Sequence, residues 1–476
     1  MTNMLHELTP RRAMLWLIAV STAIRLAFAE AVGLGVDESY MVAAGRVLRW
    51  GYFDHPPLAW WVSHLAWNDS AFAVRLPFIA LFALSTWLMF RLTASLFDER
   101  AGLWAALALN VSPVFGVSSG SWVLPDGPMI CALLGMAVCL VRGLEKPSLL
   151  VWIGVGIGAG LALLSKYTAV LPIFGVLAYL IAIPRHRGLL RTPYPWLALL
   201  VAFAVFSPVL IWNAAHGWIS FAFQGGRAGG ARFNPLGPLI VLGGEALFVL
   251  PWLWLPMMIV LWTGLRRGQL MAFMAAGPVI LFALLGFWSP RILFHWAAAG
   301  YLFLFPLLGV WLAARRPRRM AWATAGVLVS GAAVAVLLLR VNPWPLPNDP
   351  GMQAFDWTLL RAALAERGLL SYRIAAPNWS DAGKIDYALG GDPAVICLNI
   401  DARQYLFAPA PVAGDDILII APRQSEARIR ADYAGAFAAI EALPPVVFAL
   451  PGRPRVAFGL FLGRRLDWGF PALQHR

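Results

Sequence analysis

Charged side chains are scarce in this sequence. Only 13% of its 476 residues are Asp, Glu, Lys or Arg, whereas 60% are hydrophobic. An ordinary soluble domain carries about 25% charged and about 45–50% apolar residues. A soluble fold of this composition would expose too much apolar surface to stay dispersed. The shortage of charge therefore excludes an ordinary globular protein and predicts a helical membrane protein with many spans.

Cysteines are few, and cleavage signals and internal repeats are missing from the sequence. Cys131, Cys139 and Cys397 lie far apart, which excludes both a disulfide framework and the ligand spacing of a metal site. Arg25 and Glu30 interrupt the first apolar run, and no small-residue cleavage site follows it, so a span is expected there rather than a signal peptide. The lack of a repeat argues against an inverted-repeat transporter.

The net charge of +13 is unevenly distributed along the chain. Residues 341–476 hold 13 basic and 13 acidic side chains, so the whole excess lies in residues 1–340. There the basic residues gather in alternate loops, as in the cytoplasmic loops of membrane proteins, and they do not form a nucleic-acid-binding face. These loops carry Arg11/Arg12, Arg91/Arg100, Arg142/Lys146, Arg185/Arg187/Arg191, Arg266/Arg267 and Arg315/Arg316/Arg318/Arg319.

About 20 apolar residues are needed for one membrane-spanning helix. With the basic loops in the cytoplasm, the N-terminus is cytoplasmic, and an odd number of spans places the C-terminal part outside. Eleven spans are predicted, near residues 13–34, 71–91, 101–120, 126–142, 149–164, 168–184, 195–213, 237–264, 270–288, 294–313 and 320–339.

Two regions outside the predicted spans are expected to be structured. In the first outside loop, residues 39–50 and 58–65 have the pattern of short amphipathic helices lying at the membrane interface, joined by a rigid turn from Gly51 to Pro57. After a membrane domain over residues 1–340, residues 341–476 are predicted to form a small α/β domain. Its expected parts are a Pro-rich linker (341–351), a helix from Asp356 to Gly368, helices over 379–389 and 424–442, and strands over 394–398 and 416–420.

Three carboxylates, Asp37, Glu38 and Asp126, are expected at the outer ends of spans, where desolvating a charge is costly. Helix capping is the simpler explanation. Asp126 could cap the fourth span, and Asp37 and Glu38 could cap the first interfacial helix; capping alone is sufficient to explain the position of Glu38. The alternative is that these acids face one outer cavity and carry chemistry there.

Basic groups are expected at the same side of the membrane. Lys166 interrupts two apolar runs and either extends to the surface or points into a cavity at an anion such as a phosphate, with the hydroxyl of Tyr167 beside it. Arg291 and His295 lie at the outer end of the tenth span, as interfacial anchors or as ligands. Arg25 lies deeper, in the first span, and must pair or reach water.

Four motifs in this order closely resemble one group of membrane glycosyltransferases. They are Asp37-Glu38 after the first span, "GYFDHPPL" (51–58), "PDGP" (125–128) and "LLSKYTAVL" (163–171), of which "GYFDHPP" is the most specific. The group is the bacterial part of the protein O-mannosyltransferase and aminoarabinose-transferase superfamily, which has the GT-C fold and is glycosyltransferase family 39-like. The resemblance covers about residues 10–310, and the tail resembles the extramembrane domain of many members.

The resemblance implies a bacterial inner-membrane enzyme with a periplasmic C-terminal domain. Such enzymes move a sugar, with inversion, from a polyprenyl-phosphate donor to a hydroxyl of a lipid, glycan or protein. Asp37 is then the general base, Asp126 orients the acceptor or sugar, and Lys166 and Arg291 stabilise the leaving phosphate. Further substrate contacts are expected from Glu38, Asp54, His55, Tyr167 and His295.

Several alternatives stay open at this point. A transporter or a flippase of lipid-linked sugars would also need a lipid groove and buried charges. A non-enzymatic scaffold would leave the loop carboxylates unexplained. The sugar and the acceptor are not specified by the sequence. A divalent cation could be held by Asp37 and Asp126, with Glu38 and His55 as further ligands, but their spacing matches no fixed metal motif.

Overall fold

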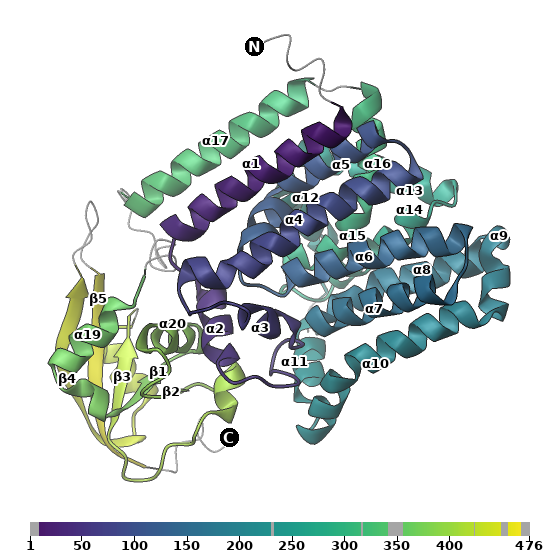
Figure 1. Ribbon diagram of the computed structural model, residues 1–476. Helices are drawn as coiled ribbons and strands as arrows, with labels where there is room; N and C mark the ends of the chain where they lie inside the picture. Colours follow the sequence, from purple (N-terminus) through teal and green to yellow (C-terminus); the bar gives the residue numbers. More distant parts are fainter. Residues whose placement is uncertain are drawn as a thin grey trace. The chain divides into compact units, whose positions relative to one another are not determined.

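The computed structural model describes residues 9–229, 233–315, 318–340, 356–422, 424–448 and 456–467 (Figure 1). The expected linker at 341–351 lies outside these residues. The chain divides into two compact units. The first contains Met1–Phe28, Arg49–Ala66 and Arg75–Val327, and the second contains Ala29–Leu48, Trp67–Val74 and Leu328–Arg476.

The first unit is helical. Three of its helices extend into the second unit, which contains Ala29–Ala31 of α1, Ala71–Val74 of α4 and Leu328–Arg340 of α17. The helices are α1 (Pro10–Ala31), α3 (Leu58–Ser63), α4 (Ala71–Leu96), α5 (Glu99–Val111), α6 (Asp126–Glu145), α7 (Leu149–Ser165), α8 (Val170–Ala182), α9 (Pro184–Arg187), α10 (Pro193–Ala215), α11 (Ile219–Ala228), α12 (Gly237–Val249), α13 (Pro251–Arg266), α14 (Leu270–Leu285), α15 (Ala298–Tyr301), α16 (Phe305–Arg315) and α17 (Arg318–Arg340).

Small residues let the helices of this unit approach one another closely. Helix α7 packs between α6 and α10 (Figure 1). A Cβ atom on Gly158 would lie 2.8 Å from the backbone nitrogen of Met136 in α6, and one on Gly156 would lie 2.5 Å from the carbonyl oxygen of Ala198 in α10. Glycines at such spacing are the means by which membrane helices gain van der Waals contact, since lipid provides little hydrophobic drive between them.

Among the residues described, five helices are long and apolar enough to cross a membrane, and the number is eight if each of three bent helix pairs counts as one span. This confirms a multi-pass helical membrane protein. Each of the eleven predicted segments overlaps a helix or a bent pair, but eleven crossings stay a prediction. The sharpest bend, 115°, separates α12 from α13 at Leu250, whose φ is +88°.

The buried Arg25 of α1 is satisfied without a carboxylate. Its Nε and one terminal nitrogen donate to the carbonyl oxygen of Gly116 (3.1 and 2.8 Å), and its other nitrogen donates to the carbonyl oxygen of Ser21 (3.0 Å). The guanidinium also lies 4.4 Å from the centre of the Phe82 ring. Carbonyl and ring contacts together meet the requirement that a charge in a span find partners.

The second unit is built on a five-stranded mixed sheet of order β2-β1-β3-β5-β4 (Figure 1). Strand β1 is parallel to β2 and β3, and β5 is antiparallel to β3 and β4. Its core contains Ile396, Ile417, Ile419 and Phe461. The elements are α2 (Val36–Gly45), α19 (Leu359–Glu366), β1 (Arg373–Ala376), α20 (Trp379–Leu389), β2 (Val395–Cys397), β3 (Ile417–Ala421), α21 (Glu426–Asp432), β4 (Phe437–Phe448) and β5 (Val456–Leu466).

The predicted small α/β domain is confirmed in its main elements, and one predicted helix is wrong. Helix 379–389 and the strands at 394–398 and 416–420 match α20, β2 and β3. Residues 424–442, however, form only the short helix α21 before β4 begins. The alanine-rich sequence of β4 has helical propensity, but its backbone pairs along most of its length with β5. Cross-strand pairing has overridden local propensity there.

Candidate active site

A buried ion pair lies at the centre of the candidate site in the first unit. The Lys166 ammonium donates to both carboxylate oxygens of Asp126, at 2.8 and 2.9 Å. Lys166 is 6% exposed and Asp126 7% exposed. Lys166 does not extend to the surface, so the simpler explanation of its position is wrong.

The local chain geometry explains how these two residues meet. Helix α7 ends at Ser165, and Lys166 follows in an extended conformation with φ −152° and ψ 133°. The Ser165 hydroxyl donates to the carbonyl oxygen of Pro125 at 2.6 Å, immediately before Asp126 at the start of α6. The N-cap residue of α6 is Pro125, and Asp126 is the first residue of the helix, so Asp126 does not occupy the predicted N-cap position. Its carboxylate pairs with the Lys166 ammonium.

The "GYFDHPPL" loop is held against helices of the same unit. Gly51 lies so close to α10 that a Cβ atom would approach Trp212 within 2.7 Å. The Tyr52 ring stacks on Trp60 at 4.0 Å between centroids. Asp54 is 2% exposed, and its carbonyl oxygen accepts a hydrogen bond from Gln224 of α11. The expected rigid turn is thus fixed by a glycine contact, ring stacking and a side chain of α11.

His55 of this loop is a neutral ring among charges. The pKa of His55 is lowered to about 4, chiefly by burial; the charges of Asp54 and Asp126 act to raise this pKa, and that of Lys166 acts to lower it. Its Nδ1 atom is buried and has no hydrogen-bond partner among the residues described. A neutral imidazole in this position can accept or donate a single hydrogen bond to a substrate hydroxyl.

His295 and Arg227 complete the cluster. The charges of Lys166, Asp126 and Arg227 all act on the His295 ring. The Arg227 guanidinium, on α11, lies 4.7 Å from the centre of the Trp296 ring. Residues 214–236 lie between two predicted spans and are expected from the sequence to form a loop, so neither α11 nor Arg227 is predicted. The three-residue spacing of Phe221, Gln224 and Arg227 is the feature of the sequence that could have indicated helix α11.

Two other predicted site residues have different surroundings. The Tyr167 hydroxyl is 2.7 Å from that of Ser220, so it is bonded to the start of α11. Arg291 is exposed, and its backbone N–H donates to the Ser289 hydroxyl at 3.3 Å. A role of either side chain in phosphate binding stays a prediction.

Asp37 and Glu38 belong to the second unit, in the first turn of α2. Glu38 is buried, and its Oε2 accepts from the backbone N–H of Gly35 at 2.9 Å, as the capping interpretation predicts. Asp37 is exposed. The expected convergence of Asp37 with Asp126 and Lys166 stays a prediction.

The chemistry of the donor set does not favour a metal at Asp126. Both of its oxygens bind the Lys166 ammonium. Within the described ranges no three His, Cys, Asp or Glu side chains form a group that could hold a metal ion. A divalent cation at Asp37 and Asp126 stays a prediction.

Comparisons with known proteins place this geometry in context. Residues 54–212 match the model of a family described as dolichyl-phosphate-mannose-protein mannosyltransferase. No curated protein sequence matches the chain. The crystal structure of ArnT from Cupriavidus metallidurans in the apo state is similar over 94% of this chain and 97% of its own length, with a TM-score of 0.64 and 15% identity. The oligosaccharyltransferase AglB from Archaeoglobus fulgidus is similar over 96% of this chain and 75% of its own, with a TM-score of 0.47 and 12% identity.

The family match over residues 54–212 confirms the predicted resemblance. The matched range contains Asp54, His55, Asp126 and Lys166; it includes "PDGP" and "LLSKYTAVL" in full and the last five residues of "GYFDHPPL". Asp37 lies before the matched range. The chain shares the fold of ArnT. At 15% identity this similarity is evidence of a shared fold only.

Proposed function

We propose that this chain, a membrane glycosyltransferase that uses a polyprenyl-phosphate sugar donor, transfers the sugar to an acceptor hydroxyl at the outer face of a bacterial inner membrane. The observation that carries the proposal is the buried Lys166–Asp126 pair beside two histidines and Arg227. A buried ion pair is weak evidence of stability, because desolvation offsets most of the attraction. Its presence beside further titratable groups is better explained by chemistry.

The charges of this cluster suit a lipid phosphate. An ammonium has three N–H donors, and Lys166 uses two of them on Asp126, which leaves one for a phosphate oxygen. Arg227 adds a second cation, so the cluster of Lys166, Arg227 and Asp126 is net positive. A fixed positive charge stabilises the phosphate as charge develops on it during departure.

The reaction we propose is a single displacement. The acceptor oxygen bonds to the anomeric carbon while the bond from that carbon to the phosphate oxygen breaks. The acceptor proton goes to Asp37, and polyprenyl phosphate leaves with the electron pair. One displacement inverts the anomeric centre. The assignment of Asp37 as base rests on the resemblance, and a carboxylate within hydrogen-bond reach is chemically sufficient for it.

Substitution of the base tests this mechanism. Asp37→Asn keeps the size of the side chain and removes the basic oxygen, so transfer should fall by at least about 100-fold. The assay is transfer of labelled sugar from purified lipid-phosphate donor by enzyme in detergent, with Asp432→Asn as a control at another acid of the second unit, which pairs with Arg428 on α21. Full transfer by the Asp37 variant would refute the base assignment.

The same reconstituted protein separates transfer from transport. A flippase of lipid-linked sugars would move donor across vesicles without covalent change, whereas the proposed enzyme yields free polyprenyl phosphate and glycosylated acceptor. The bent pair α12/α13 is the feature that a transporter would share.

The proposal also includes the eleven-span topology with a periplasmic tail, and an acceptor that is a lipid, glycan or protein.

A further inference from the structure

Helix α2, which carries Asp37, packs within the second unit against α20 of the C-terminal segment. At the centre of this contact the backbones of α2 and α20 lie very close together. A Cβ atom on Gly383 of α20 would lie 2.8 Å from the Cβ and 2.9 Å from the Cα of Tyr40. Real Cβ atoms do not approach that closely, so only glycine at position 383 allows α2 to lie where it does.

Lys384 holds the N-terminal end of α2. Its ammonium donates to the carbonyl oxygen of Leu34 at 2.8 Å, three residues before Asp37. Lys384 is 2% exposed, and its ammonium lies 5.1 Å from the centre of the Trp357 ring. Burying an ammonium is costly unless it is well bonded. This cost makes the contact between Lys384 and the start of α2 specific.

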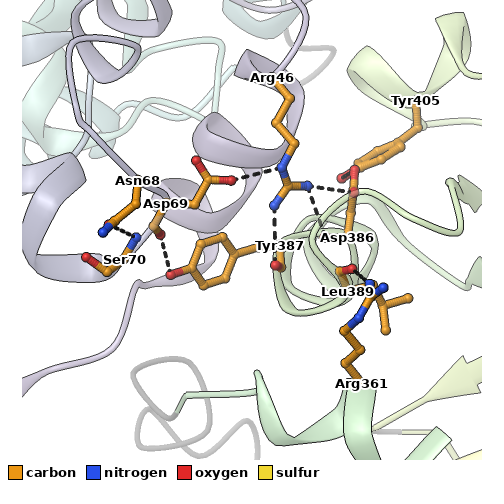
Figure 2. Close-up of polar contacts among 9 residues, drawn as sticks. All are labelled: Arg46, Asn68, Asp69, Ser70, Arg361, Asp386, Tyr387, Leu389 and Tyr405. Atoms are coloured by element: carbon orange, nitrogen blue, oxygen red, sulfur yellow. Dashed lines mark hydrogen bonds and ion pairs between the residues drawn. The ribbon is translucent and has the colours of Figure 1, made fainter. Parts of the chain in front are cut away.

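Arg46 holds the other end of α2 (Figure 2). Its guanidinium donates to the Asp386 carboxylate at 3.0 Å and to the carbonyl oxygens of Asp386 and Tyr387 at 3.1 and 3.3 Å. A further nitrogen donates to Asp69 at 3.0 Å. The Tyr405 hydroxyl donates to the second oxygen of Asp386 at 3.1 Å. Several N–H groups of the rigid Arg46 guanidinium thus form hydrogen bonds, and together they fix its orientation. A lysine ammonium could not be oriented in this way.

Tyr40 fills the edge of the sheet where a small α/β domain usually receives a ligand. Trp379 follows β1 and Tyr405 follows β2, so both lie beyond the carboxyl ends of parallel strands. The Tyr40 ring lies 5.3 Å from that of Trp379 and 6.2 Å from that of Tyr405, and its hydroxyl accepts from the backbone N–H of Gln404 at 3.2 Å. The domain binds α2 at this edge.

From these contacts we propose that the C-terminal domain serves to position Asp37, with Lys384 and Asp386 as positioning residues that fix the two ends of α2. The inference rests on the proposed function, in which Asp37 is the base. A misplacement of about 1 Å at a reacting group can lower the rate about 100-fold. A domain that holds both ends and the middle of a ten-residue helix prevents such a shift.

The test is a comparison of two Asp→Asn substitutions in the same domain. Asp386→Asn removes the charge that pairs with Arg46. Asp416→Asn is the matched control, because Asp416 pairs with Arg464 on the sheet at 2.7 Å. We expect Asp386→Asn to lower kcat roughly tenfold or more with less than about a twofold change in donor KM. Asp416→Asn should leave both unchanged, and Asp386→Glu should restore part of kcat.

The outcomes distinguish this inference from the proposed function. An unchanged kcat in Asp386→Asn and in Lys384→Met, alongside loss of transfer in Asp37→Asn, overturns the inference and leaves the function standing. Transfer that survives in Asp37→Asn overturns the base assignment instead. If Asp386→Asn does not give folded protein, Tyr405→Phe decides, because it removes one hydrogen bond to Asp386 and keeps the ion pair. A lowered kcat at constant KM supports the inference, and an unchanged kcat overturns it.

Discussion

At the scale of the residue, Lys166 and Asp126 depend on each other. Each is almost fully buried, and each is the other's ionic partner. Removing one member of such a pair leaves an uncompensated charge and typically costs about 3–5 kcal/mol, whereas replacing both by neutral groups costs much less. Single and double substitutions therefore separate a folding defect from a donor-binding defect.

Replacing Lys166 should impair use of the donor. We expect Lys166→Met to destabilise the protein, and the double variant Asp126→Asn/Lys166→Met to recover most of the lost stability. Both should show an apparent donor KM raised roughly tenfold or more, because the phosphate loses a charged donor. Thermal unfolding in detergent and donor titrations measure the two effects. An unchanged donor KM in the double variant would count against phosphate binding by Lys166.

His55 gives the stability a defined pH dependence. Burial lowers the pKa of His55 to about 4 from its ordinary 6.5, so acid favours the unfolded state, in which the ring takes up a proton more readily. The His55 contribution is constant above about pH 6.5 and becomes unfavourable as the pH falls toward 4. We expect His55→Gln to lose less thermal stability than the parent between pH 7.5 and 5. Equal losses in both proteins would contradict the neutral state of this ring.

At the scale of the element, a buried hydrogen-bonded chain joins three helices of the first unit. The Trp254 indole of α13 donates to the Tyr301 hydroxyl at 2.8 Å, and that hydroxyl donates to Glu245 of α12 at 2.7 Å. Tyr301 ends α15, six residues after His295 in the candidate site. The second oxygen of Glu245 is buried without a partner among the residues described. The Tyr301 hydroxyl is thus the donor on which the Glu245 carboxyl group depends.

Removal of the Tyr301 hydroxyl should destabilise the first unit measurably. In Tyr301→Phe the Glu245 carboxyl loses its donor, at a cost between about 0.6 kcal/mol, the average for bonds inside membranes, and about 3 kcal/mol for a buried group left unsatisfied. Tyr179→Phe in α8 is the control, because the Tyr179 ring is also buried and packs against His186 and Phe273. A thermal midpoint in Tyr301→Phe no lower than in the control would show that the chain of bonds adds nothing.

The elements differ in how far the sequence predicts them. Apolar spans and the helix over 379–389 follow from hydrophobic period and caps, such as Asn378, whose side chain accepts from the Asp381 N–H. Strand β4 could not be predicted, because its stability lies in pairing with β5, distant contacts that local propensity does not report. The same limit applies to the site. The sequence predicts Lys166 and Asp126 in one outer cavity, but their direct bond depends on how α6 and α7 pack.

At the scale of the whole molecule, the distribution of charge predicts a topology that labelling can test. In a variant with Cys131, Cys139 and Cys397 replaced by alanine, one new cysteine is introduced at the exposed Ala413 or Lys146. An impermeant maleimide should label Ala413→Cys in intact spheroplasts and Lys146→Cys only after permeabilisation. The reverse pattern would contradict a cytoplasmic N-terminus and a periplasmic tail.

The packing of α20 against α2 also has a consequence for the synthesis of the protein. Arg46 and Asp386 are separated by 340 positions, and ribosomes add about 5–20 residues per second. Roughly 17 to 70 s therefore pass between the synthesis of Arg46 and that of Asp386. During that interval α2, which carries the proposed base Asp37, lacks the helix that packs against it. Under the proposed function, copies that terminate before α20 would therefore transfer little sugar.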